Sequence, residues 1–369
     1  MMGYRFNLKR KKMIKEHKYP YEWTLKEAKF TKDKGKVFSC FACGGGSTMG
    51  YKLAGFDVLG CNEIDPKMIE AYKTNHNPKY AYLEPIQTFK TRKDLPKELY
   101  NLDILDGSPP CSSFSMAGNR EKDWGKEKKF REGQAEQVLD NLFFDFIDLA
   151  KELQPKVVVA ENVKGLLLGS AKDYVRRIYK AFEEAGYYCQ HFLLDASKMG
   201  VPQRRERVFF VCLRKDLASK FLHQVDIFTE LPKIELNFNE KKILFSELED
   251  NLGVKLNEKN ITYKRWLKRI ITDKSFGDIT ARINGKGSDF NTNIIHSNEV
   301  FPTVVSKGCE IKYNSPIKIS KSEYCKIGTY PGDYNFLTNK PAYLIGMSVP
   351  PVMTAQIASN IYEQWLSKL

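Results

Sequence analysis

Apolar and polar positions follow two alternating patterns between Val37 and Leu213. Short runs rich in β-branched and other apolar residues predict strands at Val37–Cys40, Val58–Asn62, Asp103–Asp106, Val157–Ala160, His191–Leu194 and Val208–Leu213. Apolar residues three or four positions apart predict helices at Thr48–Leu53, Pro66–Thr74, Gln137–Leu153 and Tyr174–Ala185. Because helices separate most of the strands, we predict an α/β domain built from βαβ units around a parallel sheet.

This alternation is lost after Leu213. Residues 214–315 mix short apolar pieces with Asn, Lys and Glu, which indicates a second, smaller domain. The segment Val352–Leu369 has helical spacing of its apolar residues, so we expect it to pack back on the sheet. We therefore divide the chain into a basic N-terminal arm, a large α/β domain, a smaller mixed domain and a returning C-terminal segment. These parts span residues 1–36, 37–213, 214–315 and 316–369.

The composition limits the class of protein. The chain has 369 residues, of which 42% are hydrophobic, and this excludes a disordered protein. No apolar run approaches the roughly 20 residues that span a bilayer, and no apolar signal segment is evident, so we expect a cytoplasmic protein. Eight cysteines are too few for a disulfide scaffold. The net charge of +14 favours an acidic partner, with nucleic acid placed before a membrane surface.

The positive charge is unevenly distributed. Residues 1–36 hold 12 Lys/Arg and 4 Asp/Glu, a net charge of +8, so this arm is either solvated or lies on a phosphate backbone. A second basic stretch, residues 255–286, holds nine Lys/Arg against three acidic residues, with aromatic residues among them. Basic side chains of this kind position phosphates, whereas only some side chains read base edges.

A glycine-rich turn follows the first predicted strand. The residues Phe41–Gly46 lead directly into a helix, and glycines at such a turn let the backbone approach a ligand closely. The second predicted strand, Val58–Asn62, leads into Glu63, where a carboxylate can accept hydrogen bonds from ribose hydroxyls. The pair suggests a nucleoside-containing cofactor, and a tight turn without a ligand is the alternative. The turn lacks the G-x-G-x-x-G spacing, which argues against a nicotinamide oxidoreductase.

Cys40 and Cys43 form a lone C-x-x-C without a second pair nearby, so we expect no zinc.

Three further motifs carry candidate chemistry. The prolines Pro109 and Pro110 set a rigid turn just past a strand, and a cysteine held there can become a nucleophilic thiolate, although a small buried cysteine is the alternative. Glu161 follows a buried strand, where a carboxyl can have a raised pKa, and a structural carboxylate is the alternative. Arg205 and Arg207 alternate on an extended segment, so they face the same side. Ion pairing with Glu206 or another nearby carboxylate is the alternative for one of the two.

Taken in order, Pro109-Pro110-Cys111, Glu161-Asn162-Val163 and Gln203–Arg207 resemble the motifs of cytosine-C5 DNA methyltransferases. The glycine turn and the run Ile345–Pro351 fit the same pattern, and the resemblance covers about residues 37–213 and 301–369. It implies a Rossmann-like, S-adenosylmethionine-dependent methyltransferase sheet with a mixed target-recognition domain at residues 214–315. It also implies S-adenosylmethionine as cofactor, S-adenosylhomocysteine as product, and no metal.

The resemblance assigns a role to each motif. The Cys111 thiolate would add to carbon 6 of a flipped-out cytosine, and Glu161 would interact with N3 of the base. Arg207 would contact O2, with Arg205 in support and Asn162 fixing the loop. The cofactor contacts that it implies are Phe41, Gly44, Gly45, Glu63, Ile64, Asp106, Pro109 and Ser348.

The chain departs from the family pattern at several positions. Cys43 stands where the first loop glycine is usual, and Met347 stands where asparagine is usual. Ser112 replaces a frequent glutamine after the cysteine, and Glu84 is a doubtful substitute for the aspartate that contacts the adenine. These departures concern details of the cofactor pocket and remove no catalytic group.

The expected partner is double-stranded DNA, bound by a monomer, without a membrane partner. Residues 112–136 are rich in Lys and Arg and resemble a loop that closes over DNA, with a disordered surface loop as the alternative. DNA contacts are predicted at Ser115, Arg120, Lys264, Arg265 and Arg282, although residues 263–270 could form an amphipathic helix with a solvated basic face. The leading function is modification of a specific DNA sequence, alone or with a restriction endonuclease encoded elsewhere. The alternatives are the tRNA-methylating branch of the family and a catalytically idle DNA-binding protein.

Overall fold

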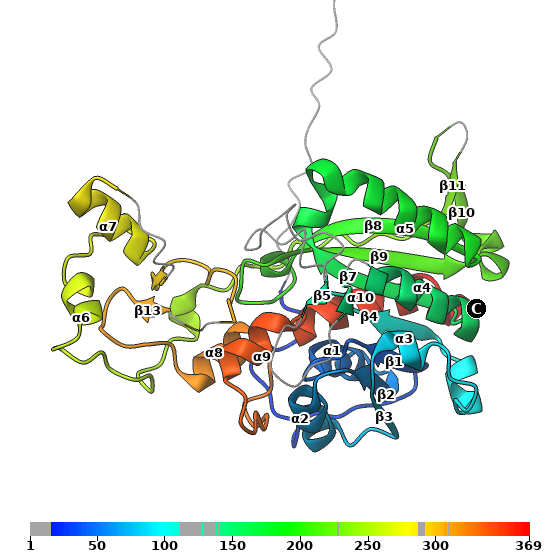
Figure 1. Ribbon diagram of the computed structural model, residues 1–369, viewed down its shortest axis with the longest axis horizontal. Coiled ribbons are helices and arrows are strands. Elements are labelled where there is room, and N and C mark those ends of the chain that lie inside the picture. Colours follow the sequence, from blue (N-terminus) through cyan, green and yellow to red (C-terminus); the bar gives the residue numbers. More distant parts are fainter. Residues whose placement is uncertain are drawn as a thin grey trace, which may run out of the picture.

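The computed structural model describes residues 16–110, 127–128, 137–138, 141–226, 229–286, 292–306, 308 and 310–369. Figure 1 shows a large α/β part and a smaller part on the left that carries α6, α7 and β13. The central sheet has seven strands in the order β3-β2-β1-β4-β7-β9-β8. Their bounds are β1 Lys36–Cys40, β2 Asp57–Glu63, β3 Tyr80–Leu83, β4 Ile104–Gly107, β7 Val157–Val163, β8 Tyr187–Asp195 and β9 Glu206–Arg214. The predicted α/β, Rossmann-like class is confirmed.

The sheet is mixed, so the prediction of a fully parallel sheet is wrong. Strands β3, β2, β1, β4 and β7 are parallel, whereas β9 runs antiparallel to both β7 and β8. Residues 196–205 join β8 to β9 without a crossover α-helix, and only such a crossover returns the chain to a parallel direction. The short edge strand β3 is missing from the sequence prediction because none of its residues is buried, so it has no apolar run to detect.

Helices cover both faces of the sheet. The helices α3 (Ile86–Phe89), α4 (Leu142–Leu153) and α5 (Lys172–Glu184) share one apolar cluster with Phe38, Leu105 and Val158. The helices α1 (Gly46–Leu53) and α10 (Pro351–Gln364) share a second cluster with the opposite face, whereas α2 spans Pro66–His76. The C-terminal segment thus packs on the sheet through α10. The helix predicted from Gln137 begins only at Leu142, because Gln137–Val138 is a short strand, β6, paired with β5 (Glu127–Lys128).

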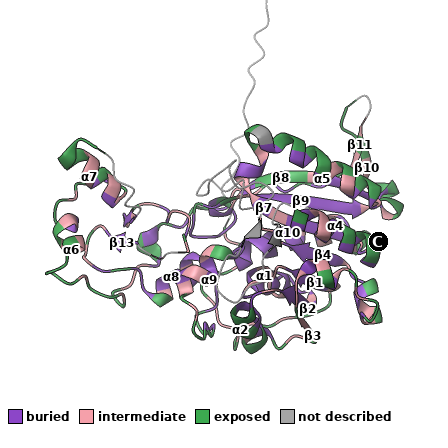
Figure 2. Cartoon of the chain, viewed as in Figure 1, coloured by how far each residue is buried: buried purple, intermediate pink, exposed green. Residues whose placement is uncertain are grey.

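The smaller part has an apolar core of its own. Its cluster consists of Trp266, Phe276, Ile279, Ile294 and Ile311, and Figure 2 shows buried residues in this part at a distance from the main sheet. Its elements are α6 Ile261–Trp266, α7 Phe276–Asn284, β12 Ile294–Ile295 and β13 Ile311–Lys312. The hairpin of β10 (Leu222–Gln224) and β11 (Glu230–Pro232) and the residues up to 238 pack with the large part instead. We therefore propose that the small domain begins after residue 238.

The remaining elements are short. The helices α8 (Lys321–Ile327) and α9 (Pro341–Met347) share an apolar cluster with residues 243–248 and 295–304, between the two domains. Single turns of 3-10 helix occur at Lys97–Tyr100, Lys164–Leu167, Gly169–Ala171, Ala196–Lys198, Lys215–Leu217, Ser219–Phe221, Phe245–Glu247 and Leu366–Lys368. None of the helices in the described ranges is long and apolar enough to cross a membrane.

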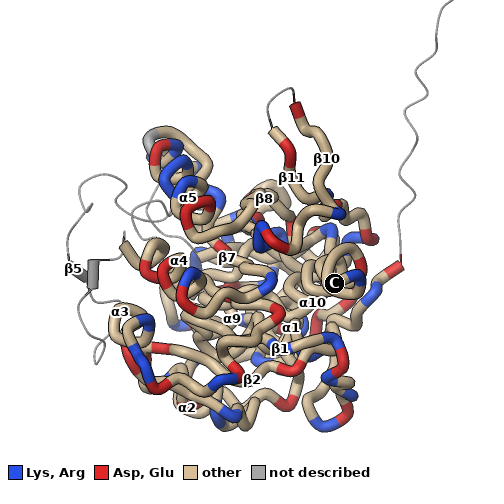
Figure 3. Tube along the Cα trace, turned by 90° about the vertical axis from the view of Figure 1, so that its right-hand side faces the viewer, with Lys and Arg blue, Asp and Glu red and all other residues tan. Residues whose placement is uncertain are grey.

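The described part of the N-terminal arm, residues 16–35, is not a solvated tail. The Tyr19 hydroxyl lies 2.5 Å from the hydroxyl of Ser359 on α10, and the Trp23 indole nitrogen donates to the Thr329 carbonyl at 2.9 Å. Aromatic residues in this segment supply apolar surface that the charge count did not reveal. The run Lys9–Lys12 lies outside the described residues. Figure 3 shows basic and acidic residues interspersed over the large domain, in agreement with its modest net charge.

Candidate active site

The candidate site lies at the carboxyl edge of the sheet. Cys40 pairs with both Asn62 and Gly107 in register, and Gly107 pairs with Ala160. The segments that follow β1, β4 and β7, together with the end of β2, therefore meet at one edge, where open α/β sheets hold their ligands. The glycine turn, Glu63, the Pro-Pro turn and Glu161 come from separate motifs, and the fold brings them together.

The glycine turn adopts an unusual backbone conformation. Phe41, Cys43 and Gly45 have φ angles of 53°, 49° and 85°, in the left-handed region that non-glycine residues rarely occupy. Glu63 holds this turn, because its Oε2 accepts a hydrogen bond from the Cys43 N–H at 2.7 Å. Its Oε1 accepts from the backbone N–H groups of Ile64 and Asp65, both at 2.9 Å. Burial raises the pKa of Glu63. A carboxylate has about four acceptor positions, so these three bonds leave room for one hydroxyl of a ligand.

The loop glycines also pack against the C-terminal segment. A Cβ on Gly44 would lie 2.6 Å from the Leu344 side chain, and one on Gly46 would lie 2.4 Å from the Val349 carbonyl. The Gly44 carbonyl accepts from the Tyr334 hydroxyl at 2.6 Å and faces Nε2 of His76 at 3.2 Å. Sequence reasoning left both ligand approach and a tight turn open for these glycines. It missed His76 and Tyr334, since no local pattern links residues so far apart in the chain.

Ser348 and Asp106 are engaged within the protein. The Ser348 hydroxyl accepts from Tyr330 and donates to the Leu344 carbonyl, both at 2.8 Å. The buried Asp106 carboxyl accepts from Ser39 at 2.8 Å and from Tyr51 at 3.1 Å. Burial raises the pKa of Asp106 to about 7. These bonds support a structural role for Asp106, and its cofactor contact stays a prediction.

Glu161 and Arg207 form the centre of the candidate catalytic group. They lie on the neighbouring strands β7 and β9, and Nε of Arg207 is 2.9 Å from Oε1 of Glu161. The ion-pair alternative therefore holds for Arg207, but its partner is Glu161. The carboxylate of Glu206 pairs with Lys164 at 2.8 Å instead.

Arg205 is buried beside this pair. Its Nη2 donates to the Gly346 carbonyl at 3.0 Å, and its Nε has no hydrogen-bond partner among the described residues. Burial and the nearby charge of Arg207 lower the pKa of Arg205 to about 9. Arg204 and Glu206 are exposed, so the predicted alternation along this segment is confirmed.

Asn162 links this group to the Pro-Pro turn. Its Nδ2 donates to the Pro109 carbonyl at 3.1 Å, and its Oδ1 accepts from the Val163 N–H at 2.8 Å. These bonds support the predicted role of Asn162 in fixing the loop. Pro110 is the last described residue of the turn. Cys111, Ser115, Arg120 and the loop 112–136, apart from the two residues of β5, lie outside the described residues.

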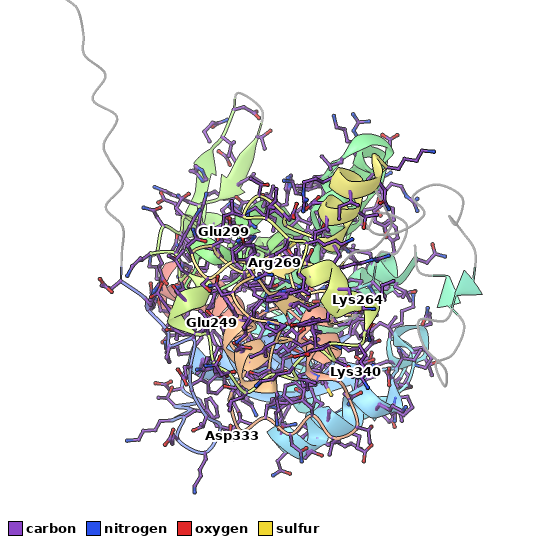
Figure 4. All side chains as sticks on the ribbon, turned by 90° about the vertical axis from the view of Figure 1, so that its left-hand side faces the viewer. Glu249, Lys264, Arg269, Glu299, Asp333 and Lys340 are labelled. Carbon is purple, nitrogen blue, oxygen red and sulfur yellow. The ribbon has the colours of Figure 1, made fainter. Side chains whose placement is uncertain are left out.

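The predicted DNA contacts of the small domain differ in exposure. Lys264 is exposed on α6 and Arg265 is half-buried. The guanidinium of Arg282 pairs with Asp273 at 2.7 Å and donates to the Lys268 carbonyl, so it already serves the domain's own structure. Figure 4, which views the molecule from the small-domain side, labels Lys264 and Arg269.

Two features of the basic residues could not be seen in the sequence. The guanidinium of Arg269, which belongs to the basic stretch 255–286, lies over the Trp266 ring of the small core, 3.3 Å from the ring centroid. A cavity of about 580 Å³ also lies between the domains. Its lining residues include Arg204, Lys242, Lys274, His296 and Glu299. Neither Arg204 nor Lys242 stood out, because their proximity depends on the fold.

The described residues contain no group of three or more His, Cys, Asp or Glu that could hold a metal ion. Cys43 lies with its sulfur 3.4 Å from the sulfur of Met68, and burial raises the pKa of its thiol to about 12. The left-handed glycine turn and the buried acceptor of Glu63 fit a nucleoside-containing cofactor, so the edge of the sheet has the donors and acceptors that such a group requires.

The sheet is Rossmann-like, and a glycine turn, a Pro-Pro turn and a Glu–Arg pair lie at one edge of it. This arrangement is typical of α/β enzymes that bind a nucleoside-containing cofactor. Residues 35–363 match the family model described as C-5 cytosine-specific DNA methylase, and the chain belongs to this family.

Individual relatives agree with this placement. The chain is 38% identical over 182 residues to the type II methyltransferase M.FnuDI of Fusobacterium nucleatum, a match that covers 49% of this chain and 48% of that protein. In that match the chain spans about half the length of its relative. It is 26% identical to the type II methyltransferase M.NgoFVII of Neisseria gonorrhoeae, over 89% of this chain and 87% of that protein. A putative DNA modification methyltransferase encoded within an Escherichia coli prophage has the same fold, with a TM-score of 0.61 at 21% identity. That likeness covers 89% of this chain and 99% of the other.

Proposed function

We propose that the protein transfers a methyl group from S-adenosylmethionine to carbon 5 of a flipped-out cytosine in a specific duplex DNA sequence. The observation that carries this proposal is the Glu161–Arg207 pair, 2.9 Å apart, beside the turn that Asn162 fixes. This group lies at the same sheet edge as the glycine turn, in a chain that belongs to the DNA methylase family.

The chemistry needs a nucleophile and a means of stabilising the charged base. The Cys111 thiolate forms a bond to carbon 6, and the ring electrons make carbon 5 able to attack a methyl group. Bound S-adenosylmethionine would supply that methyl group. Carbon 5 then loses its proton, and the thiolate leaves as the ring double bond forms again. Flipping the base out of the duplex costs a few kcal/mol, which binding to the pocket must offset.

The Glu161–Arg207 pair is suited to hold the base during these steps. Nε of Arg207 faces Oε1 of Glu161, and Oε2 of the same carboxyl group would meet N3 of the cytosine through a shared proton. The guanidinium of Arg207 has five N–H donors and stays charged, so it can donate to O2 while it keeps its bond to Glu161. Phe41, Gly44, Gly45, Glu63 and Ser348 would hold the cofactor.

DNA is the proposed partner because the interdomain cavity gathers positive charge. Arg204, Lys242 and Lys274 line it, and Glu299 is its only acidic lining residue among those described, already paired with Lys274. Arg204 is next to Arg205 in the chain, so the cavity lies within a few residues of the catalytic arginines. A phosphate of the strand that carries the target base would therefore fit this position. The type II relatives favour a restriction–modification context. We propose in addition that the protein acts as a monomer.

Labelled S-adenosylmethionine tests the proposal directly. We expect the label to enter duplex DNA but not tRNA, and Cys111→Ala to abolish transfer. A duplex carrying 5-fluorocytosine should trap a covalent adduct through Cys111, because carbon 5 then has no proton to lose. Label in tRNA alone would refute the proposed substrate. DNA binding without transfer by the wild-type protein would show a catalytically idle binder.

A further inference from the structure

The described N-terminal residues, 16–34, precede the part of the chain that matches the family. They are nevertheless tied to a short segment, residues 329–336, that follows α8. The Trp23 indole nitrogen donates to the Thr329 carbonyl at 2.9 Å, and the Trp23 carbonyl accepts from the Gly332 N–H at 2.8 Å. These two hydrogen bonds of Trp23 fix the N-terminal segment in position against residues 329–336.

Asp333 provides the second attachment. Its carboxylate accepts from the backbone N–H of Leu25 at 2.7 Å and from that of Lys26 at 3.1 Å. Figure 4 shows Asp333 at the lower edge of the molecule, on the side of the small domain. A carboxylate that accepts two backbone N–H groups makes charge-assisted bonds, which are stronger than neutral ones.

The segment is held in a conformation that it would not adopt alone. Thr329 is fully buried and has a φ angle of 53°, which a β-branched residue rarely adopts. Such a conformation persists only where the surroundings determine it. Here the Thr329 hydroxyl accepts from the Val352 N–H at 3.1 Å, and the Thr329 carbonyl accepts from Trp23.

The same segment contacts the candidate cofactor site at two points. The Tyr334 hydroxyl donates to the Gly44 carbonyl at 2.6 Å, and the Tyr330 hydroxyl donates to Ser348 at 2.8 Å. Both tyrosines are buried. The glycine turn contains two non-glycine residues with positive φ, Phe41 and Cys43, so its shape also depends on neighbouring contacts.

We propose that residues 16–34 form an intramolecular brace that sets the affinity of the glycine turn for its nucleoside-containing cofactor. The brace acts through residues 329–336, and Trp23 and Asp333 are its positioning residues. This inference rests on the proposed function, because it takes the glycine turn to be the cofactor site. Residues 16–34 lie outside the matched region, residues 35–363, and would thereby change the cofactor affinity of a site inside it.

Isothermal titration of S-adenosylhomocysteine into the purified full chain tests the brace without any methyl transfer. Trp23→Phe keeps an aromatic ring and removes the N–H, and Asp333→Asn keeps one acceptor and removes the charge. We expect each to weaken binding about fivefold, the effect of about one lost hydrogen bond. Lys29→Ala, an exposed lysine in the same segment, is the matched control and should bind as the wild type does. Amide exchange at residues 42–46 should be faster in both brace variants.

The outcomes separate three possibilities. Lower thermal stability with unchanged affinity in both variants would overturn the brace, because it would show a purely structural segment. If Trp23→Phe does not fold, Asp333→Asn alone decides, since its backbone partners remain in place. Failure of the wild-type protein to bind S-adenosylhomocysteine would instead refute the proposed function.

Discussion

Replacing Asp106 by Asn should change how stability depends on pH. Asp106 is buried beneath the site, and its carboxyl accepts hydrogen bonds from Ser39 and Tyr51. Burial raises its pKa from 3.8 to about 7 in the folded protein. The folded state therefore binds this proton more tightly than the unfolded state does. For that reason the free energy of unfolding falls as the pH rises from about 4 to about 7.

The magnitude follows from the two pKa values. A shift of this size corresponds to about 4 kcal/mol in total, of which about 2.5 kcal/mol is lost between roughly pH 5 and pH 8. Asparagine has nearly the same shape and does not ionise. The stability of Asp106→Asn relative to wild type should therefore rise by about 2.5 kcal/mol over that pH range.

Urea unfolding followed by circular dichroism at several pH values measures this difference. Other titrating groups are common to both proteins and cancel in the comparison. Ser39→Ala is an informative companion, because loss of a bond to the carboxylate raises its pKa further and should steepen the pH dependence of that variant. A stability difference between Asp106→Asn and wild type that does not change with pH would refute the reasoning.

Three further predictions concern charge. Lys242→Ala should reduce the slope of log affinity for DNA against log salt concentration by about one, because it removes one phosphate contact. Fluorescence anisotropy at several salt concentrations measures this slope. Lys241 is an exposed neighbour outside the cavity lining, so Lys241→Ala should leave the slope unchanged. Glu323→Gln should lower the free energy of unfolding by about 3 kcal/mol in urea titrations. It removes the nearer carboxylate, 2.6 Å from the buried ammonium of Lys312, and leaves only Glu249, at 3.8 Å, as its charged partner. Arg207→Lys should reduce the methyl-transfer rate at least tenfold at saturating DNA, because one ammonium cannot bond both Glu161 and the base in the geometry of the guanidinium. An unchanged rate would contradict this prediction.

The strands that form the site were predictable from sequence because they are buried. Val157 to Ala160 form a continuous apolar run, and the polar residues of the motifs begin where such runs end. The family resemblance then assigned Glu161 and Arg207 to the same base. Their ion pair depends on the register of β7 with β9, which a single sequence does not reveal.

Contacts between distant parts of the chain could not be predicted. Tyr334 contacts Gly44 across 290 positions and Trp23 contacts Thr329 across 306, and neither pair leaves a local pattern. From the sequence, the N-terminal segment was interpreted by its charge, and most of that charge comes from solvated lysine side chains. Its aromatic residues decide its position instead, because burial of aromatic surface contributes more than exposed charges do.

The separate apolar core of the small domain has a consequence for how this protein can change. That core is built from residues of its own, such as Trp266 and Phe276, and contains no residue of the seven-stranded sheet. Under the proposed function, substitutions on its surface would alter which bases are contacted without disturbing Glu161 or the glycine turn. The proposed recognition and the proposed chemistry would then depend on separate apolar cores, with the buried Lys312–Glu323 pair as one link between the small domain and α8.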